Sequence, residues 1–205
     1  KGSLGDLRTI LIRCFIEDRR LRMLLVYSGL VLGLNNAALW FYQPYFAHSG
    51  LPVAWFGVAF ASYQVFTALC STWAHGVEKR LGEKGTLMIL VFFVAMGYFL
   101  MGGFVFLFSF SFAFFHQFAR GYGRVVLTDY VNRLIDSHRR ATVLSIQSLT
   151  MRLCYAMLLP LAGIAADWGG LTRALNLLGV ATVLIGGLMF ILMARTKRVQ
   201  ERISE

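Results

Sequence analysis

The chain has 205 residues, of which 58% are hydrophobic and only 15% are charged, and its mean hydropathy is +0.64. Soluble domains carry about 45–50% apolar and about 25% charged residues, so this composition excludes an ordinary soluble domain and favours a membrane protein. The net charge of +10 does not indicate a nucleic-acid partner, because the basic residues form short clusters between apolar runs, as membrane topology requires.

Six apolar segments are predicted as transmembrane helices, since about 20 apolar residues cross a bilayer as a helix. In chain order they cover residues 22–45, 51–73, 86–101, 104–130, 141–166 and 171–194. The fold class predicted is therefore an all-α integral membrane protein in contact with the lipid bilayer, with a six-helix bundle over residues 22–194.

The segments flanking the bundle are predicted to be cytoplasmic. Leu4, Leu7 and Leu11 share one helical face, so residues 1–21 are predicted to form an amphipathic linker helix on the membrane surface, with a disordered basic linker as the alternative. Residues 195–205 are predicted to form a basic tail.

The chain has three cysteines, and none falls in a predicted external loop, so no disulfide is expected.

The third and fourth segments could be one long helix, but the charges around them argue for two. The basic stretches 78–84 and 133–140 lie on the same side of the membrane only if an even number of crossings separates them, which makes Gly102-Gly103 an external turn.

Phenylalanines at alternate positions from Phe104 to Phe114 have the period of a strand. A lone strand in lipid would leave its backbone groups unpaired, so a helix is predicted.

The basic residues are distributed unevenly between the two sides. Sixteen of the twenty lysines and arginines fall in the terminal segments and in the stretches 78–84 and 133–140, against Arg173 alone on the other side. Basic residues concentrate in cytoplasmic loops, so both termini are predicted to be cytoplasmic, in a plasma membrane or bacterial inner membrane. Arg120, Arg124 and Arg152 fall on neither side.

Polar side chains recur at helical spacing in three of the predicted spans, which places them on one face of each helix. Three such faces suggest one aqueous cavity; the alternative is that the neutral side chains only join neighbouring helices and that Arg124 reaches the cytoplasmic interface. The candidate substrate-binding residues are Asn36, Trp40, Gln43, Tyr63, Gln64, His116, Gln117, Arg120, Arg124, Gln147 and Arg152.

Three of these candidates have a chemical role that their side chains suggest. Arg120 would pair with an anionic group, because a guanidinium stays charged and binds carboxylate or phosphate bidentately. Trp40 would pack against the apolar part of a solute. His116 would carry a coupling proton, because its unperturbed pKa lies near physiological pH, although a neutral structural histidine is the alternative.

The six predicted spans follow the order polar, polar, apolar, polar, polar, apolar. This order resembles half of a major facilitator superfamily transporter. Short stretches agree with its C-terminal half: Phe41-Tyr42-Gln43-Pro44-Tyr45 before Gly50 and Gly57, Arg120-Gly121, and Arg140-Ala141-Thr142. The resemblance implies two inverted three-helix repeats, a central site alternately open to each side, and an N-terminal six-helix half as partner.

The stretch 78–84 is similar to the gating loop of that family, Gly-x-x-x-Asp-Arg-x-Gly-Arg. Aligned on Gly82, Arg80 keeps the basic position, Lys79 stands in the Asp position, and Glu78 could replace the missing acid. The resemblance therefore implies that Glu78, Arg80, Gly82 and Arg140 are gating residues.

The function predicted is secondary active transport of a small solute, including an anion, by alternating access, with proton-coupled efflux as one form. No cofactor or metal is expected, because the four histidines are scattered along the chain. A non-transporting receptor or scaffold is the alternative, followed by an intramembrane enzyme, for which no Gly-x-Ser-x-Gly occurs. Gly121-Tyr122-Gly123 is not predicted to be an ion filter, because the flanking arginines would repel cations.

Overall fold

The computed structural model describes residues 18–204, and of these the side chains of residues 18–193. The prediction of an all-α protein is confirmed. The helices are α2 (Arg19–His48), α3 (Phe56–Gly103), α4 (Ala113–Asn132), α5 (Arg140–Gly169) and α6 (Leu171–Ser204), with 3₁₀ turns η2 (Val53–Trp55), η3 (Leu107–Phe112) and η4 (Ser137–Arg139). The predicted linker helix up to residue 17, and the side chains of the predicted basic tail, lie outside the described residues.

Four helical stretches of the described chain are long and apolar enough to cross a membrane: Arg19–His48, Val53–Gly103, Ser137–Gly169 and Leu171–Met193. The predicted first and fifth spans correspond closely to α2 and α5. The sixth begins as predicted at Leu171, but its helix continues through the predicted tail to Ser204. Six separate helices are not formed, because the predicted second and third spans belong to the single element α3.

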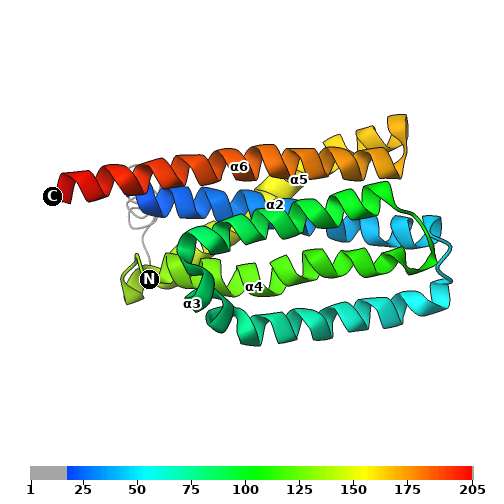
Figure 1. Cartoon of the computed structure of the whole chain (residues 1–205), viewed down its shortest axis with the longest axis horizontal. Coiled ribbons are helices and arrows are strands. Elements are labelled where there is room, and N and C mark those ends of the chain that lie inside the picture. Colours follow the sequence, from blue (N-terminus) through cyan, green and yellow to red (C-terminus); the bar gives the residue numbers. More distant parts are fainter. Residues whose placement is uncertain (1–17, 205) are drawn as a thin grey trace.

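The predicted loop at residues 78–84 is almost entirely helical. Glu78, Lys79 and Arg80 are good helix formers, so the helix continues past the apolar run. Its backbone leaves helical geometry only at Gly82, where φ is +66° and ψ is 177°. Glycine adopts this conformation without the penalty that a Cβ would bring. Figure 1 shows α3 reversing direction at this bend, so that its two arms run antiparallel. The two inverted repeats stay a prediction.

The predicted fourth span, residues 104–130, is not among the four candidate spans, and its helix α4 begins only at Ala113. Phe104 and Phe106 have extended backbone, and η3 separates them from the start of α4 at Ala113. The alternating phenylalanines from Phe104 to Phe112 form neither a strand nor an α-helix, whereas Phe114 belongs to α4. Two tyrosines from other helices satisfy backbone carbonyls of this segment: Tyr45 donates to Phe104 O at 2.7 Å and Tyr63 to Phe110 O at 2.6 Å. Side-chain donors thus supplement the backbone hydrogen bonds of this segment.

Helix α2 is the centre of the bundle and α5 lies at its edge. In the most apolar stretch of α2, 72% of the residues are buried, against 6% in the most apolar stretch of Ser137–Gly169, to which α5 belongs. Helix α4 packs mainly against α3, whereas α5 packs against α2 and α6. Helices α4 and α5 barely touch one another although both contact α2. Space therefore remains between α4 and α5, with α2 as its floor.

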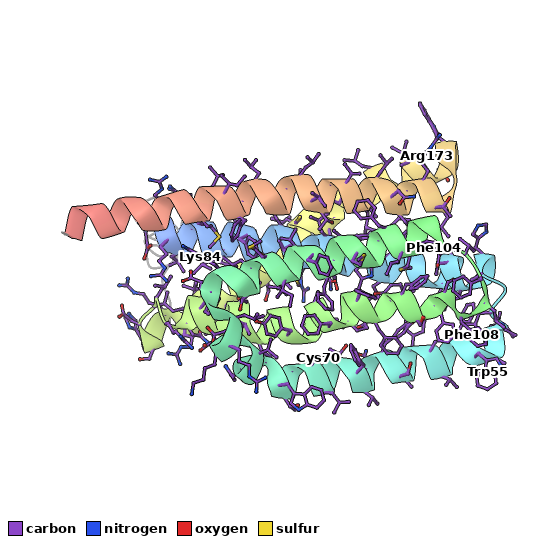
Figure 2. The ribbon with its side chains drawn as sticks, viewed as in Figure 1. Trp55, Cys70, Lys84, Phe104, Phe108 and Arg173 are labelled. Atoms are coloured by element: carbon purple, nitrogen blue, oxygen red, sulfur yellow. The ribbon has the colours of Figure 1, made fainter. Side chains whose placement is uncertain are left out.

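The basic junctions gather at one end of the bundle. The start of α2, the bend of α3, the α4–α5 junction and the end of α6 lie together in Figure 1. Figure 2 places Lys84 at this end and Arg173 at the opposite one. Among residues 18–193, Arg20 pairs with Glu83 at 3.2 Å and Arg133 with Asp129 at 2.6 Å, both at the basic end. The charge asymmetry of the sequence is thus an asymmetry of the folded bundle.

Candidate solute-binding site

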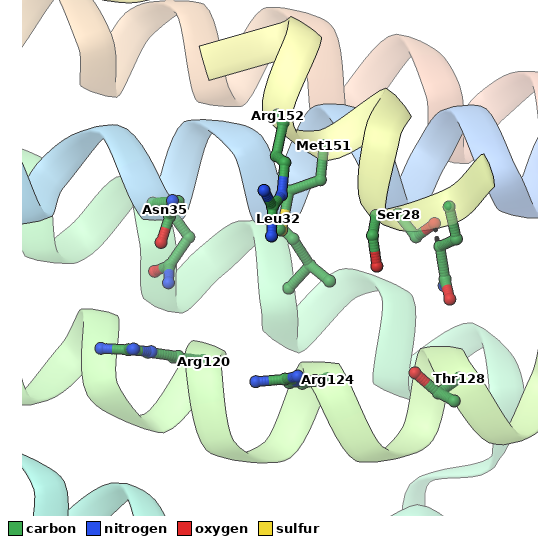
Figure 3. A pocket seen from close by; sticks show the side chains of 11 residues that line it. Ser28, Leu32, Asn35, Arg120, Arg124, Thr128, Met151 and Arg152 are labelled. Carbon is green, nitrogen blue, oxygen red and sulfur yellow. Dashed lines mark hydrogen bonds between the residues drawn. The ribbon is translucent and has the colours of Figure 1, made fainter. Parts of the chain in front are cut away.

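A polar pocket of about 250 Å³ lies between α2, α4 and α5 (Figure 3). Each helix contributes residues spaced three, four or seven apart, which share one helical face. The lining residues are Ser28, Leu32, Asn35 and Asn36 from α2, Arg120, Arg124 and Thr128 from α4, and Gln147, Ser148, Met151 and Arg152 from α5. The structure therefore joins Asn36, Arg120, Arg124, Gln147 and Arg152 of the predicted site in one cavity.

Three arginines face this pocket. Arg120 and Arg124 project from α4 on one wall, and Arg152 reaches towards them from α5 on the other (Figure 3). Within residues 18–193, none of the three makes a hydrogen bond or an ion pair. Their charges are therefore uncompensated by this part of the chain, and an arginine at membrane depth costs at least a few kcal/mol unless it meets water or a counter-charge.

None of the carboxylates within residues 18–193 lines this pocket. They are Asp18, Glu78, Glu83, Asp129, Asp136 and Asp167. An anion about 4 Å from one guanidinium would gain about 4 kcal/mol at an effective dielectric constant near 20. With no acid among the lining residues, the pocket has a positive potential that attracts anions.

The wall beside the arginines contains one satisfied polar pair and one unsatisfied group. Gln147 donates to Ser28 Oγ at 3.1 Å, and that hydroxyl donates to Leu25 O at 3.0 Å, which ties α5 to α2. Asn35 is only 5% exposed, and its Oδ1 has no hydrogen-bond partner. A buried polar atom left unpaired costs about 1–3 kcal/mol, so Asn35 is a group that a bound molecule could satisfy.

Gln117 lies outside the pocket, although its spacing placed it on a face with Arg120. Its amide nitrogen donates to Tyr42 Oη at 3.1 Å, and its amide oxygen accepts from Thr67 Oγ1 at 3.0 Å. Gln117 therefore links α4 to α2 and α3, as the helix-joining alternative expected.

Replacing Gln117 with leucine is expected to lower the free energy of unfolding by about 1–3 kcal/mol, because it leaves the Thr67 and Tyr42 hydroxyls without this partner. Thermal unfolding in detergent measures the change. The exposed Gln64 provides the control, since Gln64→Leu should alter stability by less than about 0.5 kcal/mol. Equal stability of the two variants would contradict a structural role for Gln117.

His116 is also outside the pocket. Its side chain is fully buried, and its ring lies 4.5 Å from the Tyr98 ring and 6.2 Å from the Tyr42 ring. Gly97 makes room for it, since a Cβ there would lie 2.7 Å from the imidazole. Neither ring nitrogen has a hydrogen-bond partner among the described residues, so the bond to a neighbouring helix that the structural alternative requires is not observed. A proton-carrying role stays a prediction.

The other predicted substrate contacts are dispersed. Trp40 is 63% exposed, and Gln43 and Gln64 are exposed on the bundle surface. Tyr63 is buried in an aromatic cluster, with its ring 5.7 Å from that of Tyr42. None of the four lines the pocket. Within residues 18–193 they therefore do not form one binding site with the arginines.

The predicted gating residues all lie at the basic end of the bundle. Glu78 accepts a hydrogen bond from Tyr130 Oη at 2.9 Å, which connects the first arm of α3 to the end of α4. Gly82 forms the bend of α3. Arg80 and Arg140 are exposed, with Arg140 opening α5. Their position is suitable for a gate, and the role itself stays a prediction.

The sequence interpretation omitted several lining residues. Asn35 is adjacent to Asn36 and one helical heptad from Ser28, and Thr128 continues the four-residue spacing of Arg120 and Arg124. Extending the stripe of α4 by one turn would have found Thr128, and extending that of α2 by two turns would have found Ser28. The unpaired state of Asn35 depends on tertiary packing and has no sequence signal.

The fold and the site together define an all-α protein with four candidate membrane spans and a basic pocket among its helices. No family model, curated protein or solved structure matches the chain. The pocket is therefore the feature of the molecule that indicates its function.

Proposed function

We propose that the chain is the C-terminal half of a secondary active transporter of the major facilitator type, which moves a small solute by alternating access. In this proposal the two arms of α3 act as separate spans, giving six spans in two inverted repeats, with α2, α4 and α5 beside the central path. The observation that carries the proposal is the pocket with three unpaired arginines. Charged residues at membrane depth are expensive and commonly belong to solute pathways.

The exposed face of α5 supports a further part of this proposal. Met157 is 73% exposed and Leu161 is 65% exposed, and with Leu149, Leu153 and Trp168 they form an apolar stripe beside the pocket. The apolar stripe can face lipid or another bundle of helices. We assign the opposite side of the central path to an N-terminal six-helix half, which would close the pocket where α4 and α5 diverge. Rocking of the halves would expose the pocket to each side in turn.

Alternating access is tested by labelling a cysteine inside the pocket. In the intact protein with its native cysteines replaced by serine, Ser148→Cys should react with an impermeant thiol reagent applied to either face of the membrane, in right-side-out and inside-out vesicles. His48→Cys, exposed at the non-basic end, should react from one face only. A receptor or scaffold with a fixed pocket would label Ser148→Cys from a single face, which would refute the proposal.

We assign the protein to the plasma membrane, with both termini and the bend at Gly82 on the cytoplasmic side. We expect His48→Cys to react with an impermeant reagent added outside intact cells and Lys84→Cys to react only after permeabilisation. Both side chains are exposed, so access to reagent decides the result. Labelling of Lys84→Cys from outside would reverse the orientation.

A further inference from the structure

We propose that the pocket binds a small hydroxylated polyanion, a solute with at least two negative charges and a hydroxyl group. Hydroxydicarboxylates and phosphate esters of small polyols share this chemistry. The inference deepens the proposed transport function by naming its substrate class, but binding itself depends only on the pocket.

The charge requirement follows from the three arginines. Arg120, Arg124 and Arg152 face one cavity, and no lining residue carries a negative charge. A monoanion would neutralise one guanidinium group. The other two positive charges would remain unneutralised in the same small cavity. Two anionic groups could engage α4 and α5 at once, because Arg152 lies across the pocket from the α4 pair (Figure 3). Carboxylate and phosphate oxygens both match the planar donor fork of arginine.

The hydroxyl requirement follows from Asn35. Asn35 belongs to the lining of the same cavity, and its Oδ1 is a buried acceptor without a partner among the described residues, which a solute reaches once the amide turns towards the cavity. A dianion that carries only acceptors would repel this oxygen, whereas a solute hydroxyl would donate to it. Asn35 lies near Arg120 at one end of the pocket, so the hydroxyl would lie close to one anionic group (Figure 3).

The size of the cavity limits the solute. At about 250 Å³ it is smaller than the roughly 300–1,000 Å³ of sites for drug-sized ligands. Leu32 and Met151 supply apolar lining. The part of the site that this chain forms is therefore suited to a compact solute.

Binding is measured by isothermal titration of the intact protein in detergent with malate, succinate and glycerol 2-phosphate. Malate and succinate differ by one hydroxyl, so malate should bind about three to ten times more tightly, the range expected for one buried hydrogen bond. Asn35→Ala should abolish this preference. Comparison of malate with glycerol 2-phosphate decides between carboxylate and phosphate as the preferred group.

The arginine variants test the charge requirement. Arg120→Gln and Arg152→Gln should each weaken malate binding at least about tenfold, and Arg152→Lys should recover part of the loss. Arg173→Gln removes the same charge at the opposite end of the bundle and should leave binding unchanged. If a glutamine variant fails to fold, the lysine variant and Asn35→Ala still decide the result.

The outcomes separate this inference from the proposed function. Absence of binding by all three anions would overturn the inference and indicate that a fixed carboxylate elsewhere in the protein pairs with the arginines. Equal malate affinity of wild type and Arg152→Gln would also overturn it. Malate binding without two-sided access of Ser148→Cys would keep the inference and reject the transporter; two-sided access without anion binding would do the reverse.

Discussion

Replacing Arg120 with lysine is expected to leave expression and thermal stability near wild type and to lower solute transport about tenfold. Arg120 has no hydrogen bond or ion pair within residues 18–193, so the substitution breaks no polar contact of this part of the chain. Lysine keeps the positive charge but loses the planar fork that binds an anionic group bidentately. A loss of about 1.4 kcal/mol of charge-assisted bonding corresponds to a factor of ten.

The matched control is Arg124→Lys, which should be milder because Arg124 is the more exposed of the two α4 arginines. Initial rates of solute exchange in proteoliposomes, at matched protein levels, measure both variants. If Arg120 only stabilised the bundle, stability and transport would decline together. Unchanged transport by Arg120→Lys would remove this residue from the site.

Replacing Gly121 with leucine is expected to lower the free energy of unfolding by about 3 kcal/mol and the Tm by about 10 °C. A Cβ at Gly121 would collide with the backbone carbonyl of Thr67, where α4 crosses the first arm of α3. A backbone atom cannot move aside as a flexible side chain can, so the two helices would have to separate.

Gly76 provides the control for this close approach. It also lies in α3, but a Cβ there meets nothing within 4 Å. Gly76→Leu should leave the Tm unchanged or slightly raised, since leucine has the higher helix propensity. Thermal unfolding in detergent gives both values. Equal Tm values for the two variants would show that Gly121 does not control the distance between α3 and α4.

The helices that the sequence predicted well are those with long uninterrupted apolar runs. Helices α2 and α5 begin and end within a few residues of the prediction, because apolar length and flanking charge determine where such a helix lies. The segment between α3 and α4 was predicted poorly. Its backbone accepts hydrogen bonds from Tyr45 at Phe104 and from Tyr63 at Phe110 in η3, and both tyrosines are distant in sequence. Local periodicity has no information about such contacts.

The pocket was predictable to the extent that helical spacing determines it. Arg120, Arg124 and Arg152 were identified because charge inside an apolar span is conspicuous, and the structure brings them together. Gln117 has the same spacing but turns towards Tyr42, because neighbouring helices cover that side of α4. Spacing predicts which residues share a face, whereas packing decides which part of that face remains open.

The central claim is that the arginine pocket is a site from which a bound solute crosses the membrane. The measurement that tests it most directly is exchange of radiolabelled malate into proteoliposomes that contain the intact protein and unlabelled malate. We predict saturable exchange that Arg152→Gln abolishes and Arg173→Gln preserves. Malate that binds the protein in detergent but does not exchange across the membrane would contradict the claim, because the pocket would then bind a solute without translocating it.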